Sequence, residues 1–309
     1  MNERVSVIIP VFNGASTVRR AIESALKQTH RNIEVVVIDD GSTDETAAIL
    51  QTYGTAIRVM RQANSGVSNA RNLGIAESHG AWIAFLDADD EWLPEKTERQ
   101  LRLFSSVPSL GFATTGTLWF GARGVGRRTG AGSLIFENLL SRNSIVTSSV
   151  MVRKSCLAQF SEAFRPDLKY GEDWELWLRL AARFSGMSLP DALVKKYSTS
   201  ANATLGISIA CCRSQYQQVL YYLERDPATA EVIARHSEFV KASIGFRMAG
   251  FLYEHGQRKE AARELSTALA MCPTLLVSHS VQILKILVMP ISVRDAINKM
   301  VSGIGLGHT

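Results

Sequence analysis

The stretch Ala81-Trp-Ile-Ala-Phe-Leu-Asp87-Ala-Asp89-Asp90-Glu91-Trp92 decides the fold of this chain. Its apolar part, residues 82–86, predicts a buried strand that ends at Asp87. Two carboxylates one residue apart suit Mg²⁺, which takes one or two carboxylates and fills its other positions with phosphate and water oxygens. The alternative interpretation is a solvated turn whose last acid caps the helix that begins near Pro94.

Size and composition define the broad class of protein. The 309 residues are 46% hydrophobic and 20% charged, as in a soluble protein with one large domain and a smaller one, or with two ordinary domains. The formal net charge of +5 suits phosphorylated ligands or an anionic membrane surface, and it is too weak to indicate nucleic acid as a partner. The four cysteines form no CxxC pair and predict reduced thiols in a cytosolic protein. No apolar segment is long enough for a membrane span, so we expect a cytoplasmic location, with peripheral membrane association left open.

Strand and helix patterns alternate through the first hundred residues. Apolar runs rich in β-branched residues predict strands at 5–12, 33–38, 57–60 and 81–86, and helical patterns cover 45–53 and 65–78. This order predicts a mostly parallel sheet with helices on both faces. Ligands of such sheets bind beyond the carboxyl ends of the strands.

Polar clusters follow these strands where a ligand would bind. Asp39 and Asp40 end one predicted strand, Asp87 and Asp89 end another, and residues 64–71 open a helix. We therefore expect three polar clusters to meet on one rim of the sheet. Capping of local turns alone would not require this convergence.

The second half of the α/β part is less regular. Residues 95–104 predict a helix, 110–120 a strand, 144–152 a strand-like stretch and 188–196 a closing strand. The glycine- and arginine-rich segment 121–132 predicts a mobile loop beside a substrate, and the sequence leaves open whether it orders on binding. Glu172 and Asp173 open a helix with an apolar face, and capping and catalysis are both open for them.

Beyond residue 205 the pattern becomes helical. Helices are expected at 207–225 and 229–251, and residues 245–273 have the spacing of one tetratricopeptide-like hairpin. We therefore expect an α/β domain over 1–205 and an all-helical C-terminal extension over 206–309. The apolar segment 275–291 predicts core or a homodimer contact, with membrane contact as the alternative.

Five motifs together resemble family 2 glycosyltransferases with the GT-A fold, over residues 5–197. They are Val5-Ser-Val-Ile-Ile-Pro-Val-Phe-Asn13, Ile38-Asp-Asp-Gly-Ser-Thr-Asp44, Ser65-Gly-Val-Ser-Asn-Ala-Arg-Asn72, Asp87-Ala-Asp89 and Gly171-Glu-Asp-Trp174. The resemblance implies an α/β, Rossmann-like enzyme of the hexosyltransferase type that uses Mn²⁺ or Mg²⁺. It would move a sugar, with inversion, from a nucleoside-diphosphate donor (a UDP-sugar is preferred) to a hydroxyl. The acceptor would be a sugar, a lipid-linked molecule or a protein in polysaccharide or glycoconjugate synthesis.

The resemblance also implies roles on the donor side. Pro10 and Phe12 would line the base pocket, and Asp40 would hold the edge of the base. Arg71 would face the nucleotide and its phosphates, and Asp87 would approach the ribose or a metal-bound water.

Asp89 would then be the metal ligand, and Asp173 matches the base of the family. Glu172 and Trp174 would contact the donor or acceptor sugar. These roles fit the chemistry, because a bound cation offsets charge on the leaving diphosphate and a carboxylate can take the acceptor proton.

The chain departs from the family pattern in two places. Residues 197–200 lack the histidine that many relatives carry after the closing strand, and residues 159–164 replace the Gly-Gly-Phe before the acidic pair. The acceptor therefore cannot be carried over from the family. Two alternatives stay open: a nucleotidyltransferase or nucleotide-sugar hydrolase on the same fold, and a non-catalytic scaffold.

Overall fold

The computed structural model describes residues 3–121, 124–128, 130, 132–141, 143–197, 209–254 and 256–272. The chain forms two compact units, one of residues 1–136 with 144–203 and one of residues 137–143 with 204–309. Residues 137–143 therefore group with the helical unit, although the sequence analysis assigns them to the first domain. Within that unit the Arg247 guanidinium donates to the carbonyl oxygen of Leu140 at 3.2 Å.

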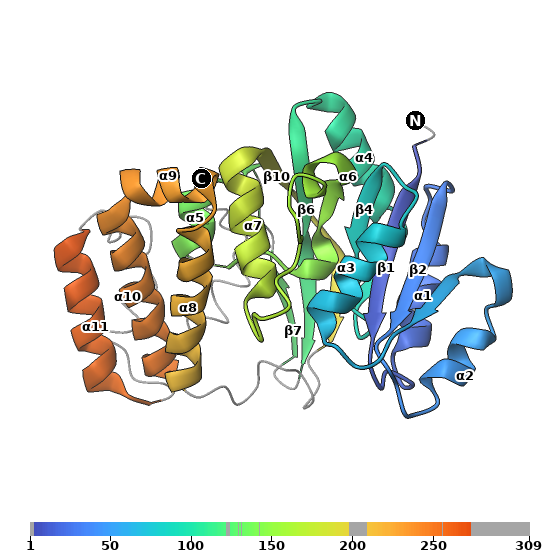
Figure 1. The fold of residues 1–309 in the computed structure, drawn as a ribbon, viewed down its shortest axis with the longest axis horizontal. Coiled ribbons are helices and arrows are strands. Elements are labelled where there is room, and N and C mark those ends of the chain that lie inside the picture. The colour runs from blue at the N-terminus through green and yellow to red at the C-terminus, as the bar shows by residue number, and fades with distance from the viewer. Residues whose placement is uncertain are drawn as a thin grey trace. The chain divides into compact units, whose positions relative to one another are not determined.

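One mixed sheet organises the first unit (Figure 1). Its order is β3-β2-β1-β4-β9-β6-β10-β5, with β7 paired to β6 and β8 to β10. The strands are β1 Val5–Val11, β2 Ile33–Asp39, β3 Arg58–Arg61, β4 Trp82–Phe85, β5 Glu91–Trp92, β6 Leu110–Gly121, β7 Gly124–Arg128, β8 Gly132–Ser133, β9 Met151–Arg153 and β10 Ser185–Tyr197.

The parallel part of the sheet is its N-terminal half, as the alternating pattern predicts. Strands β3, β2, β1 and β4 are parallel to one another, and so are β6 and β10. Strands β5, β7, β8 and β9 run antiparallel to their neighbours. The two strand ends that carry the predicted acids, those of β2 and β4, therefore belong to the regular half of the sheet.

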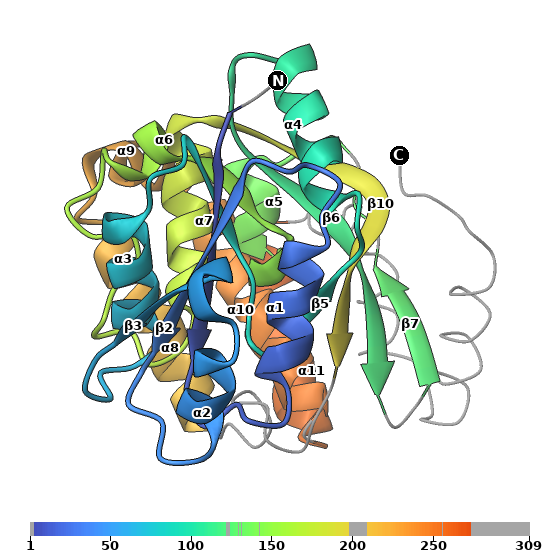
Figure 2. The same ribbon diagram turned by 90° about the vertical axis from the view of Figure 1, so that its right-hand side faces the viewer.

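Helices cover both faces of this half, and Figure 2 shows α1 and α3 on opposite sides of β1 and β2. Alternate residues of β1 (Val5, Val7, Ile9 and Val11) join a core with α1 (Val18–Leu26), α2 (Thr46–Gln51) and α4 (Lys96–Ser106). On the other face Gly74 of α3 (Val67–Glu77) touches Ile8 so closely that an added Cβ would lie 2.5 Å from Ile8 Cγ2. Burial on both faces explains the uninterrupted apolar run of β1.

The remaining short elements of this unit are the 3₁₀ turns η1 (Gly54–Ala56) and η2 (Thr147–Ser149) and the helices α6 (Lys154–Leu157) and α7 (Glu172–Arg183). Helix α7 packs Trp177 against Phe85 of β4, with ring centroids 6.2 Å apart. This contact places the start of α7 in the same unit as the end of β4.

Two expectations for the middle of the chain are wrong. Residues 124–128, which we expected in a mobile loop, form β7 and pair with β6, because the glycine-rich sequence still forms the backbone ladder of a hairpin. The strand-like stretch 144–152 contains η2, and only Met151–Arg153 is strand. Thr147, Ser148 and Ser149 form this turn, and all three are buried.

The second unit is helical. It contains α5 (Phe136–Ser141) from its second residue onward, α8 (Ile209–Leu223), α9 (Pro227–Arg235), α10 (Ser237–Glu254) and α11 (Arg258–Met271). The expected single helix over 229–251 is divided, because His236 leaves helical geometry between α9 and α10, with φ −122° and ψ 31°. Neither glycine nor proline marks this break in the sequence.

Helices α10 and α11 form the expected hairpin. Ala249, Leu252, Ala261, Leu265 and Ala268 are buried in its core, and Gly256 makes the turn with φ +80°. The assignment as a tetratricopeptide-like unit stays a prediction, and the apolar segment 275–291 lies outside the described residues. In the described part of the chain, no helix has the length and apolar character needed to cross a membrane.

Candidate active site

The carboxyl end of β4 carries a compact acid cluster. Oxygens of Asp87, Asp89 and Asp90 all lie within 4.8 Å of one another. Ser148 of η2 fixes the turn, since its hydroxyl donates to Asp90 Oδ2 at 2.6 Å and accepts from the Asp87 backbone N–H at 3.1 Å. Arg20 of α1 donates to the carbonyl oxygen of Asp89 at 2.6 Å. The turn is therefore held from two neighbouring elements.

This cluster has the composition of a divalent-metal site. All its donors are carboxylate oxygens, which Mg²⁺ and Mn²⁺ prefer. Asp90 Oδ1 is buried and has no hydrogen-bond partner, so the cluster still has an unsatisfied acceptor. The residues therefore fit the metal that the family resemblance implies.

The charges around the cluster shift its pKa values in opposite directions. Burial, opposed by Lys196 and supported by the Asp87 charge, raises the pKa of Asp90 to about 7. Burial and the Asp87 charge also raise the pKa of Asp89. Burial would raise the pKa of Asp87 too, but the charges of Arg71 and Lys196 outweigh it, so that this pKa is lowered. Asp87 is therefore the acid of the cluster that stays ionised most readily.

Arg71 joins the end of β4 to the start of α7. Its Nη2 lies 2.8 Å from Asp87 Oδ1 and its Nη1 lies 3.0 Å from Glu172 Oε1, with 5% of the side chain exposed. The two acids together raise the pKa of the guanidinium despite its burial. Gly66, with φ +91°, precedes α3 and allows the turn that brings this helix to the strand ends.

Replacing Arg71 should destabilise the fold strongly. Arg71→Met leaves the partly buried Asp87 and Glu172 without their buried partner, and we expect a loss of about 3 kcal/mol in the free energy of unfolding. Urea denaturation followed by tryptophan fluorescence measures it. Lys27→Met, which breaks an exposed pair with Glu23 at 2.9 Å, is the matched control and should cost at most about 0.5 kcal/mol. Equal losses in the two variants would contradict a structural role for Arg71.

Asp173 lies at the start of α7 beside the same cluster. Its Oδ2 accepts from the Thr147 hydroxyl at 3.0 Å, and its Oδ1 accepts from the Trp174 backbone N–H at 2.6 Å. Burial raises the pKa of Asp173, although Arg71 and these two hydrogen bonds oppose the shift. Gly171, with φ +78°, provides the left-handed residue from which the helix begins.

The two neighbours of Asp173 differ in exposure and partners. Glu172 is bound to Arg71, and burial together with the Asp173 charge raises its pKa. Trp174 is 3% exposed, so its ring presents almost no surface to a sugar in this state of the protein. The sugar contacts expected for both residues stay predictions.

Asp40 organises the loop that leads into α3. Its Oδ1 accepts from Gln62 Nε2 at 2.7 Å and from the Ser65 N–H at 2.8 Å, and its Oδ2 accepts from the Gly66 N–H at 2.9 Å. Pro10 is buried in β1, whereas Phe12, directly after β1, is 50% exposed. The ring of Phe12 is thus available to a planar ligand, and the nucleotide contacts of all three residues stay predictions.

Sequence reasoning missed three residues of this site. Ser148 bonds to Asp87 and Asp90, and Thr147 bonds to Asp173. The sequence shows both residues only as hydroxyls in an apolar stretch. Lys196, near the end of β10, places its Nζ 3.4 Å from Asp90 Oδ2. Burial would lower the pKa of Lys196, but the charges of the three aspartates raise it, so the ammonium form is favoured. A lysine in a predicted strand gives no sign of this position.

The sheet has this strand order and carries acids at its strand ends, and Arg71 joins these acids to an acidic helix start. This arrangement is that of the GT-A class of glycosyltransferase. Among solved structures, S. aureus TarS 1–349 in complex with UDP-GlcNAc matches with a TM-score of 0.62 at 18% identity, over 86% of this chain and 90% of that chain. The mannosyltransferase PcManGT from Pyrobaculum calidifontis, in complex with GDP-Man and Mn²⁺, matches with a TM-score of 0.59 at 15% identity, over 97% and 80% of the two chains. These likenesses confirm the predicted fold class.

Sequence comparison identifies the family. The family model described as glycosyl transferase family 2 matches residues 6–144. An uncharacterized glycosyltransferase of Rickettsia prowazekii is 31% identical over 208 residues, which are 65% of this chain and 65% of the relative. A putative teichuronic acid biosynthesis glycosyltransferase of Bacillus subtilis, TuaG, is 30% identical over 62% of this chain and 77% of its own length. The chain belongs to glycosyl transferase family 2, and it spans just under two thirds of the length of the Rickettsia relative.

Proposed function

We propose that this protein is a metal-dependent, inverting glycosyltransferase that moves a sugar from a nucleoside-diphosphate donor to a hydroxyl group. The observation that carries the proposal is the Arg71 bridge, because it joins the acid cluster of β4 to the helix start that holds Asp173. Complexes of the structural neighbours with UDP-GlcNAc and with GDP-Man and Mn²⁺ support a nucleotide-sugar donor. The likeness to TuaG supports a polysaccharide acceptor.

On the donor side, the residues of the chain would hold the diphosphate and its cation. Asp89, with Asp87 and Asp90, would bind Mn²⁺ or Mg²⁺, and the bound ion would act as a Lewis acid toward the leaving diphosphate, an effect worth several kcal/mol. Lys196 adds a positive charge beside the same acids. Phe12 would stack on the base, and Asp40 would bind its edge.

On the acceptor side, Asp173 would take the proton of the attacking hydroxyl. The hydroxyl oxygen forms a bond to the anomeric carbon, the bond from that carbon to the diphosphate oxygen breaks, and its electron pair leaves with the diphosphate. Attack opposite the leaving group inverts the anomeric centre. A carboxylate positioned in this way contributes about 10²–10⁴-fold to the rate.

Product analysis tests the reaction class. The protein is incubated with UDP-GlcNAc or GDP-Man and Mn²⁺, with and without a panel of oligosaccharide acceptors, and released nucleoside diphosphate is measured. We expect release that depends on an acceptor and matches the amount of glycosylated product. Release of nucleotide at the same rate without acceptor would identify a hydrolase and overturn the proposal.

The activity should fall at low pH because of Asp173. Asp173 can act as a base only in its carboxylate form. Burial raises the pKa of Asp173 and the Asp87 charge adds to this, whereas Arg71 and the hydrogen bond from Thr147 oppose it. Since an ordinary aspartate titrates near 3.9, we expect kcat/KM to decline as the pH falls toward a value above that one. Saturating Mn²⁺ separates this effect from Asp90, whose pKa is about 7. A profile that is flat down to pH 4 would contradict the assignment.

Lys196 should compete with the metal ion. Its ammonium group neutralises the acid cluster in part, so Lys196→Met should bind Mn²⁺ on the order of tenfold more tightly in the absence of nucleotide. Electron paramagnetic resonance of free Mn²⁺ measures this affinity directly. Lys195→Met is the matched control, because Lys195 pairs with Glu91 at 2.8 Å. Weaker Mn²⁺ binding in the Lys196 variant would show that the lysine does not oppose the cation.

The cellular location belongs to the same proposal. The thiol of Cys156 forms no disulfide, which favours a reducing compartment such as the cytoplasm. Membrane contact through residues 275–291 would concern a segment outside the described residues, and a homodimer through the C-terminal helices stays a prediction.

A further inference from the structure

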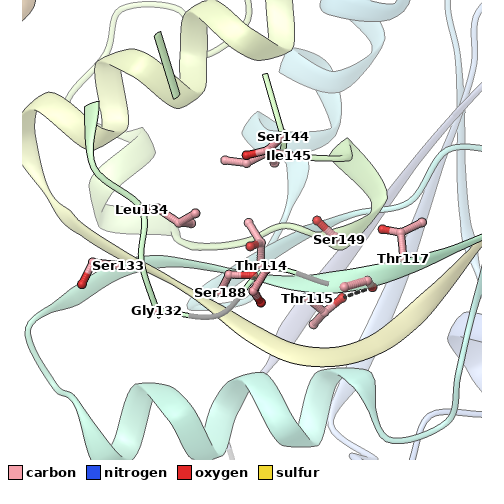
Figure 3. A pocket seen from close by; sticks show the side chains of 12 residues that line it. Thr114, Thr115, Thr117, Gly132, Ser133, Leu134, Ser144, Ile145, Ser149 and Ser188 are labelled. Atoms are coloured by element: carbon pink, nitrogen blue, oxygen red, sulfur yellow. Dashed lines mark hydrogen bonds between the residues drawn. The ribbon is translucent and has the colours of Figure 1, made fainter. Parts of the chain in front are cut away.

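A small polar pocket lies in the first unit, between β6, β8, β10 and η2 (Figure 3). Its volume is about 100 Å³, well above the roughly 10–15 Å³ that one buried water needs. Seven of its twelve lining residues carry a hydroxyl group and none carries a charge. The pocket therefore differs in chemistry from the acid cluster at the end of β4.

An irregularity between two paired strands opens this space. Thr114 of β6 pairs with Ser188 of β10, and Gly116 pairs with Ala192, so residues 189–191 face Thr115 alone. The extra residues disrupt the ladder and separate the strands locally, as β-bulges do. The threonines of β6 border the resulting gap, as Figure 3 shows.

Two of these hydroxyls have no hydrogen-bond partner among the described residues. The side chains of Thr114 and Thr117 are 3% and 2% exposed, and neither hydroxyl makes a hydrogen bond within the described part of the chain. Neither hydroxyl oxygen belongs to the fully buried polar atoms without a partner, and both residues line the pocket, so the two hydroxyls are accessible to a molecule that enters it. Each of them can both donate and accept a hydrogen bond.

The lining indicates the kind of ligand. Divalent metal ions prefer carboxylate ligands, and phosphate groups are commonly bound by Arg or Lys; none of the lining residues is charged. Hydroxyl groups together with the apolar side chains of Leu134 and Ile145 match a sugar ring, which presents hydroxyls at its edge and C–H groups on its faces. The pocket is thus suited to an uncharged polyhydroxyl ligand.

The position of the pocket links it to the proposed reaction. Ser149, which lines the pocket, ends the same 3₁₀ turn in which Thr147 donates to Asp173. We propose that this pocket binds an uncharged sugar residue, supplied by either the acceptor or the donor. The inference rests on the proposed glycosyltransferase function, and it assigns a sugar-binding role to Thr114 and Thr117.

The test is a binding experiment on the whole chain with ¹³C-labelled threonine methyl groups. The probes are neutral methyl glycosides of glucose, N-acetylglucosamine, mannose and galactose, then UDP with Mn²⁺, then UDP-GlcNAc and GDP-Man with Mn²⁺. We expect saturable shifts of the Thr114 and Thr117 methyl signals. Shifts caused by free glycosides identify the acceptor as the source, and shifts caused by a nucleotide sugar but not by UDP identify the donor.

Variants that remove only the hydroxyls complete the test. The double variant T114V/T117V should retain its melting temperature. It should bind the probe that shifts the methyl signals at least about tenfold more weakly than the wild type. Thr97→Val, which removes a buried hydroxyl bound to Gln28 at 3.0 Å, should lower the melting temperature and leave sugar binding unchanged.

Unchanged sugar binding in T114V/T117V, or the absence of any shift at the two methyls with every probe, would overturn the proposal and leave a pocket filled by water. Such a result would not affect the proposed reaction, because acceptor-dependent nucleotide release and the role of Asp173 are measured separately.

Discussion

Asp173→Asn should reduce kcat by about 10²–10⁴-fold while nucleotide-sugar binding stays within a few-fold of the wild-type value. The amide keeps the shape of the side chain: its oxygen can still accept from the Trp174 N–H, and its NH2 group can donate to the Thr147 hydroxyl, which lies 3.0 Å from Asp173 Oδ2. It cannot take a proton from the acceptor hydroxyl. The loss should therefore appear in the chemical step and not in the fold.

Steady-state kinetics and a thermal-melting curve measure the two parts of this prediction. Asp167→Asn is the control, because Asp167 is an exposed acid in the segment before α7. We expect the control to transfer sugar at the wild-type rate. A fully active Asp173→Asn protein would exclude Asp173 as the base, whatever happened to its stability.

Asp89→Asn should abolish the metal dependence of donor binding. The carboxylate is one of three whose oxygens lie within 4.8 Å, and removing its charge weakens the site for a divalent ion. Because the cation supplies several kcal/mol to leaving-group stabilisation, and 1.36 kcal/mol is tenfold in rate, kcat/KM should fall by about 10³-fold.

Calorimetric titration of UDP with and without Mn²⁺ measures the binding part. The wild type should bind UDP more tightly with Mn²⁺, whereas Asp89→Asn should bind it equally weakly under both conditions. Glu95→Gln, an exposed acid close in sequence, should behave as the wild type. Full Mn²⁺ stimulation of the Asp89 variant would remove Asp89 from the metal site.

The regular half of the fold could be predicted because its signals are local. Burial on both faces of β1 requires an unbroken apolar run, and parallel strands place their acids on one edge of the sheet. These two rules led to the expectation that the acids after residues 33–38 and 81–86 would meet residues 64–71 on one rim. Asp40 accepts from the Ser65 and Gly66 N–H groups at 2.8 and 2.9 Å, and Arg71 lies 2.8 Å from Asp87.

The supporting residues could not be predicted because their partners are distant in the sequence. Ser148 meets Asp90 only when η2 folds against the end of β4, and a serine in an apolar stretch gives no signal for that. The break at His236 and the pairing of β7 also depend on tertiary contacts and not on a local glycine or proline signal. Lys196 is a further example, since its position beside Asp90 follows from the register of β10 against β5 and β6.

Paramagnetic relaxation by Mn²⁺ tests the central claim most directly, namely that the metal-binding acids and the base share one site. The protein carries ¹³C-labelled threonine methyls and is titrated with Mn²⁺ and UDP. We expect the Thr147 methyl, beside Asp173, to broaden beyond detection, while the methyl of the exposed Thr52 at the end of α2 stays sharp. The Asp89→Asn variant should show no such broadening. A sharp Thr147 signal at saturating Mn²⁺ and UDP would contradict the account.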